Sequence, residues 1–174
     1  MSQFVRDARI TMIYEGANGV QAMDLVGRKL AQNGGRAIQR FFAMVGGETA
    51  AAKADARLAD FCARLEKANG ELKAATMWFM QNGMASPNNV GAGAHSYMHI
   101  LGIVVIGLMW LRMAQAATAA LDSGTDDKSF YETKLVTARF FAENLAVGAP
   151  ALADTVIDSA EGVLAISADA LAVA

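Results

Sequence analysis

The segment SPNNVGAGAHSYMHILGIVVIGLMWLRMAQAATAALD, residues 86–122, decides the fold of this chain. Ser86 can cap the free amides at a helix start, and Pro87 suits the first helical position because its missing N–H costs no hydrogen bond there. No second proline follows before Gly124, so the pattern predicts one long helix. Four glycines fall inside it: Gly91, Gly93, Gly102 and Gly107. Glycines are costly inside an isolated helix, so they predict that neighbouring helices approach this backbone closely.

Helical periodicity extends to both sides of this segment. The expected elements are a linking helix from residue 20 to the Asn33-Gly34-Gly35 break, helices over 36–45, 49–81 and 128–147, and a last helix from residue 151. We expect Gly46-Gly47 to end the helix over 36–45. Gly70 interrupts the helix over 49–81 and indicates a kink or a close crossing there.

These elements predict an all-α fold, an antiparallel bundle of about four long helices preceded by a short loop and a linking helix. No strand pattern is present in the sequence. Hydrophobic residues make up 54% of the 174 residues and charged residues 18%, which excludes a disordered chain. The break at residues 33–35 is the best internal boundary, and it divides 1–33 from 34–174.

The charge and cysteine content exclude several classes of partner. The net charge is −2 and the Lys and Arg residues form no stripe, so we expect no nucleic-acid partner. The most apolar run, residues 100–111, holds twelve residues, whereas a bilayer span needs about 20, so we expect no membrane span. Cys62 is the single cysteine, which fits a reducing compartment, and we expect a cytoplasmic protein.

The candidate chemistry lies near the N-terminus, in RDARITMIYEGANGVQ, residues 6–21. Glu15 is a lone carboxylate between an apolar stretch and a glycine-containing turn, and desolvation there would raise its pKa and make it a base near neutral pH. Gly16 lets the backbone approach a ligand. Asn18 and Gln21 offer amide groups near a helix start, where free N–H groups can meet an anion. By residue type alone, a glutamate before a glycine is also a common turn or cap residue.

The run RDARITMIYEGANGVQAMDLVGRKL, residues 6–30, resembles the closing motif of the acyl-CoA dehydrogenase family. That motif is usually written as Arg-Asp, then Ile-Tyr-Glu-Gly-Thr, then Ile-Gln. The downstream sequence, including ARFFAEN at residues 138–144, is similar to the extra C-terminal helical domain of a subgroup that includes methylmercaptopropionyl-CoA dehydrogenase-like enzymes.

The resemblance implies a role for each residue of the motif. Glu15 is expected to remove the proton from the carbon next to the thioester carbonyl, while a hydride leaves the neighbouring carbon for FAD. The product is a trans-2-enoyl-CoA. Tyr14 and Gly16 are expected to border the acyl-CoA substrate, and Asn18 and Gln21 to lie near FAD.

The resemblance also implies how the chain relates to a complete enzyme. Residues 1–33 correspond to the end of the catalytic helical domain and 34–174 to the bundle domain, and the usual electron acceptor is an electron-transferring flavoprotein. The domains that build most of the FAD and CoA contacts come before this motif, so we expect the chain alone to be inactive. Ala17 stands where the family usually has Thr or Ser, so a hydroxyl expected near the cofactor is missing.

Other residues suggest alternatives. His95 and His99 are four apart, a spacing that can hold a metal, but no carboxylate lies nearby in that helix, so packing is favoured and no metal is expected. Trp78, Phe79, Met109 and Trp110 are interpreted as core residues. The pairs Phe41-Phe42 and Phe140-Phe141 cannot face one core together, which predicts a homo-oligomer. A non-enzymatic helical interaction or oligomerisation module is therefore the alternative function.

Overall fold

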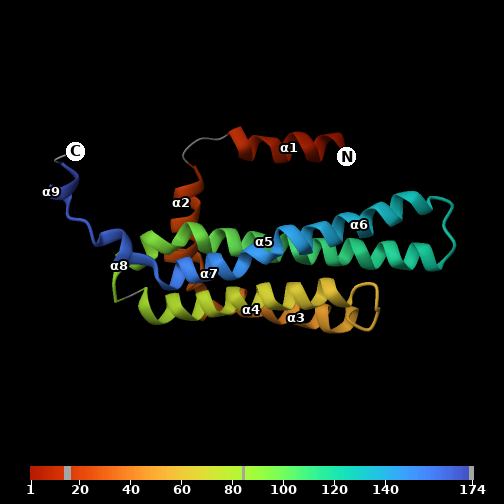
Figure 1. Ribbon diagram of the computed structural model, residues 1–174, viewed down its shortest axis with the longest axis horizontal. Coiled ribbons are helices and arrows are strands. Elements are labelled where there is room, and N and C mark those ends of the chain that lie inside the picture. The colour runs from red at the N-terminus through yellow and green to blue at the C-terminus, as the bar shows by residue number, and fades with distance from the viewer. Residues whose placement is uncertain (14–16, 84, 173–174) are drawn as a thin grey trace.

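A computed structural model describes residues 1–13, 17–83 and 85–172, and every regular element within these ranges is a helix (Figure 1). The α-helices are α1 (Ser2–Ile13), α2 (Ala17–Asp24), α3 (Arg36–Ala52), α4 (Ala59–Asn82), α5 (Pro87–Asp122), α6 (Lys128–Asn144), α7 (Ala149–Ile157), α8 (Ser159–Leu164) and α9 (Ala168–Leu171). One π-helical turn, η1 (Leu25–Lys29), and two 3-10 turns, η2 (Gln32–Gly35) and η3 (Ala146–Gly148), connect them. The all-α prediction is confirmed.

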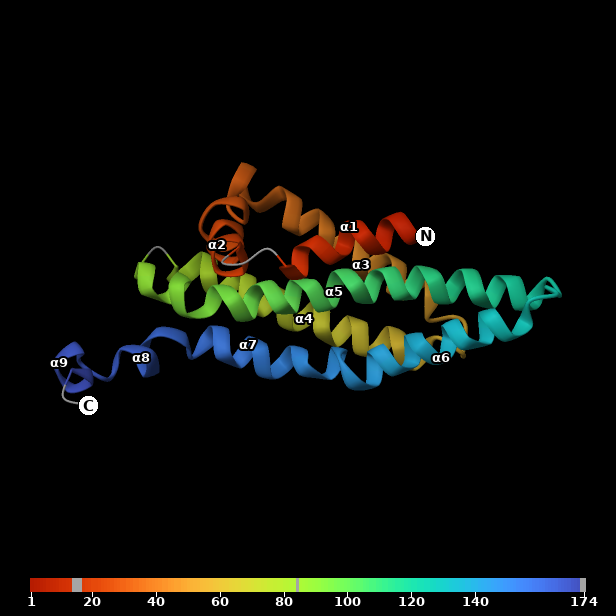
Figure 2. The same ribbon diagram turned by 90° about the horizontal axis from the view of Figure 1, so that it is seen from above.

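The bundle is built around α5. α3 and α4 form an antiparallel pair below α5 in Figure 1, and α6 and α7 return along it as one almost continuous rod (Figures 1 and 2). The core where these helices meet consists of large side chains that are at most 2% exposed: Leu72, Tyr97, Ile100, Val104, Leu108, Leu111 and Val156. The prediction of about four long antiparallel helices is therefore confirmed.

α5 begins and ends where the sequence pattern places it. Ser86 is its extended N-cap, Pro87 lies in its first turn, and it ends at Asp122. Two of its four glycines lie against neighbouring helices. A Cβ atom at Gly93 would lie 2.9 Å from Cζ of Phe79, and one at Gly107 would lie 2.7 Å from a terminal methyl of Leu65. The other two, Gly91 and Gly102, have no such neighbour within 4 Å, so close approach explains only half of them.

This difference predicts opposite tolerance at two glycines of one helix. Gly93→Val is expected to lower the free energy of unfolding by about 1–3 kcal/mol, because the added methyl groups would overlap the Phe79 ring and the α7 backbone beside it. Gly102→Val, at an unobstructed position, should change it by less than about 0.5 kcal/mol. Urea unfolding of both variants measures the difference. Equal midpoints would contradict the close packing at Gly93.

Two predictions about glycines in the first half of the bundle were wrong. Gly46-Gly47 does not end a helix, because α3 continues through both residues to Ala52. Thr49 is fully buried and its hydroxyl donates to the carbonyl of Val45 at 2.8 Å, which spans the two glycines. Burial of this face outweighs the glycine cost of about 1 kcal/mol per residue. Gly70 is exposed in the uninterrupted helix α4 and lies at no crossing.

In the N-terminal part, the predicted end of the linking helix is confirmed, but the predicted start of the chain is not. Asn33, Gly34 and Gly35 have φ angles of 52°, 66° and 72°, and this left-handed stretch ends the linking helix as expected. The short loop expected at the beginning is wrong, because the chain opens with the twelve-residue helix α1. No residue of α1 is buried.

The core contains one buried hydroxyl pair. The oxygens of Thr76 and Tyr97 lie 2.8 Å apart, and the Thr76 hydroxyl also donates to the carbonyl of Leu72. Because Thr76 donates to the carbonyl, the Tyr97 hydroxyl is the donor in the pair. Burial raises the pKa of Tyr97 to about 12, so it stays neutral. Cys62 is buried, as its place on the inner stripe predicts, and burial raises the pKa of its thiol.

Within the described residues, two stretches are long and apolar enough to cross a membrane by length and composition alone. They are α5 and the stretch Lys128–Ile157, with a mean hydropathy of 1.8 and 1.2 in their 18-residue windows. In the fold, 39% and 33% of these windows is buried within the bundle. Core helices of water-soluble bundles have the same composition, so the expected lack of a membrane span stays a prediction.

Candidate functional site

The residues predicted to carry the chemistry fall in and beside the junction between α1 and α2. Tyr14, Glu15 and Gly16 lie outside the described residues, so their predicted roles remain predictions. α1 ends at Ile13 and α2 begins at Ala17, so a helix flanks this short segment on each side.

α2 presents the two predicted cofactor-contacting amides to solvent. Asn18 and Gln21 are both exposed and lie about one helical turn apart, so they project from the same side of α2. α2 is anchored on the bundle through Ala22, which is 1% exposed, and α2 lies across α5 in Figure 1. The two amides are therefore held on a fixed helix and remain free to contact another group.

The carboxylate at the end of α2, Asp24, is already paired. The Asp24 carboxylate lies between Arg28 and Lys29, with its Oδ2 3.0 Å from the Lys29 ammonium. Hydrogen bonds from Arg28, and then from Lys29, hold the pKa of Asp24 below its usual value. A carboxylate that is ionised and paired in this way is a poor proton acceptor. Asp24 is thus not an alternative to Glu15 as a base.

Helix α1 carries a signal that the sequence interpretation missed. Phe4 and Met12 are 75% and 85% exposed, and the apolar side chains Val5, Ile10 and Ile13 are also exposed. These residues lie on both sides of the helix, a pattern typical of a helix that is surrounded by other elements. The apolar spacing in residues 4–13 could have predicted both the helix and its need for a partner.

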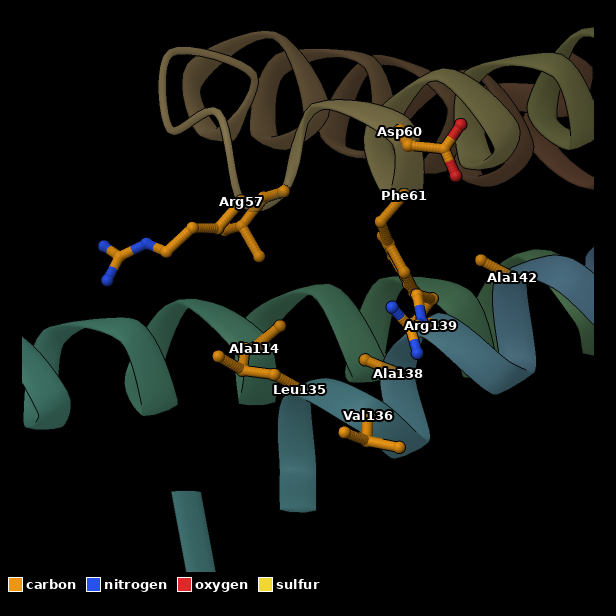
Figure 3. Close-up of a pocket in the computed structure, with 10 residues that line it drawn as sticks. Arg57, Asp60, Phe61, Ala114, Leu135, Val136, Ala138, Arg139 and Ala142 are labelled. Carbon is orange, nitrogen blue, oxygen red and sulfur yellow. The ribbon is translucent and has the colours of Figure 1, made fainter. Parts of the chain in front are cut away.

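A separate cavity of about 260 Å³ opens between α4, α5 and α6 (Figure 3). Small side chains form its floor, and they are Ala114, Ala138 and Ala142. Arg57 from the loop ahead of α4 and Arg139 from α6 stand at its rim. It lies near the start of α4, toward the opposite end of the bundle from α2 (Figure 1), so it is not part of the predicted site.

Arg57 at this rim forms ion pairs that connect parts of the fold. Its guanidinium donates two hydrogen bonds to Asp122 at the end of α5, at 2.9 and 2.8 Å, and three to Asp55, at 2.7–3.1 Å. These bonds hold the pKa values of both carboxyls below their usual range. Arg57 therefore fastens the α3–α4 loop to α5, and its charge is already matched.

The two histidines lie together at the surface. The ring centroids of His95 and His99 are 4.4 Å apart and both residues are exposed. Within the part of the chain that the structure describes, no group of three or more His, Cys, Asp or Glu residues is placed to hold a metal ion. A two-histidine pair leaves most of a metal's coordination to other ligands.

Comparison with known proteins connects this bundle to a family of enzymes. The family described as "Acetyl-CoA dehydrogenase C-terminal like" matches residues 36–167. The chain is 33% identical to 3-methylmercaptopropionyl-CoA dehydrogenase of Ruegeria pomeroyi, over 96% of this chain and 28% of that protein. It is 34% identical to the broad-specificity linear acyl-CoA dehydrogenase FadE5 of Mycobacterium tuberculosis, over 83% of this chain and 25% of that protein.

A butyryl-CoA dehydrogenase of Syntrophomonas wolfei is 30% identical over 84% of this chain and 24% of that protein. The chain thus spans about a quarter of the length of these curated relatives, which are matched only in their C-terminal part. The chain belongs to the acetyl-CoA dehydrogenase C-terminal like family and corresponds to the C-terminal part of acyl-CoA dehydrogenases.

Proposed function

We propose that this chain is the C-terminal part of an FAD-dependent enzyme that oxidises an acyl-CoA thioester to a trans-2-enoyl-CoA, with Glu15 as the base. One observation carries the proposal. The motif at residues 6–21 is joined, in one chain, to a bundle whose relatives are named as dehydrogenases of acyl-CoA thioesters.

Glu15 performs the proton transfer in this proposal. Its carboxylate accepts the proton from the carbon next to the thioester carbonyl, and the electron pair of that C–H bond forms the new double bond. The hydride then leaves the neighbouring carbon, so the thioester loses two electrons and two hydrogens. Such a C–H group is weakly acidic, so the base has to be desolvated and well positioned. Tyr14 and Gly16 border the thioester on each side of the base.

FAD, when bound, supplies the acceptor for that hydride. Asn18 and Gln21 fit one edge of its site, because both amides are exposed on the same side of an anchored helix. Neither residue lines the 260 Å³ cavity between α4, α5 and α6. A cofactor of this size therefore needs further walls, which we assign to the domains that precede the motif.

The proposal also includes the domain boundary, the electron acceptor and the oligomeric state. Residues 1–33 belong to the end of the catalytic helical domain and 34–174 to the bundle domain, and the isolated chain is inactive. The complete enzyme is a cytoplasmic homo-oligomer that passes electrons to an electron-transferring flavoprotein. The exposure of Phe140, at 58%, beside the buried Phe141 supports the oligomer.

A chimera tests the proposal. The chimera is the Ruegeria pomeroyi relative with its matching C-terminal segment replaced by this chain, so that Glu15 is the glutamate of its motif. We expect the chimera to purify with about one FAD per chain and to oxidise an acyl-CoA, and the isolated chain to purify without flavin. The unaltered Ruegeria enzyme is the control. A folded, flavin-containing chimera without dehydrogenase activity would refute the proposed function, and stoichiometric flavin on the isolated chain would refute its inactivity.

A further inference from the structure

An apolar surface runs along α5 and onto α3, which we call the open face. It consists of five side chains that are 39–50% exposed: Met44, Val105, Ile106, Met109 and Met113. Met109 lies three or four residues from each of Val105, Ile106 and Met113, so the four from α5 project from one side of that helix. The expectation that Met109 lies in the core was therefore wrong. α5 is the most apolar of the four longest helices, yet the bundle covers this side of it only in part.

The charge on the open face is matched within it. Arg112 lies among these residues and donates hydrogen bonds to both carboxylate oxygens of Glu48, at 2.8 and 2.6 Å. Its Nη2 also lies 3.4 Å from the sulfur of Met44. The open face is thus apolar, and the charge of Arg112 is already paired within it. Such a face suits contact with an apolar surface of another protein domain. Anionic lipid headgroups and nucleic acids are bound by clusters of Lys and Arg instead.

Helix α1 lies on the same side of the molecule. α4 packs below α5 in Figure 1, and α6 and α7 pack beside it, so the view from above in Figure 2 looks onto the side of α5 that these helices leave uncovered. α1 runs roughly parallel to α5 on this side, set apart from it in Figure 1, and no residue of α1 is buried. A twelve-residue helix is marginal in water without tertiary packing, so α1 also needs a partner.

We propose that the open face is the seat of the dehydrogenase part that precedes this bundle in a longer chain, and that α1 is the end of that part. This inference rests on the proposed function. The relatives join the bundle to about three times its length of further protein, since the chain covers 28% and 25% of them. A covalently attached domain is present at an effective concentration on the order of mM, and α1 belongs to the stretch that connects the two parts.

Methionine oxidation by hydrogen peroxide tests the seat, because the rate follows the exposure of the sulfur. Met44, Met109 and Met113 report on the open face. Met77 on α4, which is 48% exposed, is the matched control outside it. Peptide mass spectrometry measures each rate in the isolated chain and in the chimera. In the isolated chain we expect all four to react at similar rates. In the chimera, the three open-face residues should react about tenfold more slowly than Met77.

Equal rates for Met77 and the open-face residues in the chimera would overturn the seat. Protection that develops in the isolated chain as its concentration rises would overturn it in favour of a second copy. Protection of the isolated chain by phosphatidylcholine vesicles would overturn it in favour of a lipid surface. Failure of the two proposals is distinguishable. A chimera that binds flavin and is active, but whose open-face methionines react fast, refutes the seat alone. A chimera whose open-face methionines are protected, but which has no dehydrogenase activity, refutes the proposed function alone.

A paired substitution adds a second readout. Ile106→Glu places a charge in the middle of the open face, and Met77→Glu places the same charge on α4, at a similarly exposed position. In the chimera, we expect Ile106→Glu to restore fast oxidation of Met109 and Met113, because a buried unpaired carboxylate would weaken the contact. Met77→Glu should leave both rates unchanged. Equal rates in the two variants would count against the seat.

Discussion

Replacing Glu15 by glutamine in the chimera is expected to lower turnover of an acyl-CoA by about 10²- to 10⁴-fold, the contribution typical of a positioned general base. Glutamine keeps the size of the side chain but cannot accept the α-proton. FAD should remain bound, because the predicted cofactor contacts are Asn18 and Gln21. Steady-state turnover and the flavin-to-protein ratio are the two measurements.

Asp24→Asn is the matched control for this substitution. Asp24 is the carboxylate at the end of α2, and Arg28 and Lys29 already pair it. Loss of the Asp24 carboxylate should change turnover by less than about twofold, because its ion pairs lie at the surface of the linking helix and contribute little energy. If Glu15→Gln kept half of the activity, or if both substitutions had the same effect, Glu15 would have no part in the reaction.

The second large effect is expected in the core. Phe79 is 4% exposed, packs edge-on against Tyr97 with ring centroids 5.5 Å apart, and fills the space over Gly93. Phe79→Ala should lower the free energy of unfolding by about 3–5 kcal/mol, because it removes buried apolar surface and leaves a cavity. In a chain of this size that corresponds to a fall in melting temperature of roughly 6–20 °C.

Phe140→Ala is the control for the core substitution. Phe140 is 58% exposed on α6, so its truncation should change the stability of the isolated chain by less than about 0.5 kcal/mol. Thermal unfolding followed by circular dichroism compares the two variants. Similar melting temperatures for both would show that Phe79 does not pack as described.

The bundle could be predicted from the sequence where local chemistry and packing agree. Ser86-Pro87 and the Asn33-Gly34-Gly35 stretch mark boundaries whose backbone geometry follows from residue type, and both predictions are confirmed. Gly46-Gly47 failed as a boundary because burial of Thr49 and its neighbours keeps α3 intact. The true break, at residues 53–58, contains no Gly or Pro and is held by the long-range ion pair between Arg57 and Asp122.

The candidate site could be predicted only through the motif. A single glutamate before a glycine has no periodicity or partner that distinguishes a base from a turn residue, and Tyr14, Glu15 and Gly16 lie outside the described residues. Asn18 and Gln21 are exposed on an anchored helix, which agrees with a contact to a further group. The open face was missed because Ile106 and Met109 are as apolar as the core residues beside them. Their exposure depends on which neighbours α5 has.

Anaerobic mixing of the chimera with butyryl-CoA tests the role of Glu15 most directly. Transfer of the hydride reduces the flavin, so its visible absorbance follows a single oxidation of the thioester without any electron acceptor. We predict that the chimera loses this absorbance within one turnover, and that the Glu15→Gln chimera, with the same flavin content, keeps it on that timescale. Loss of absorbance at the same rate in both proteins would contradict a proton-abstracting carboxylate at position 15.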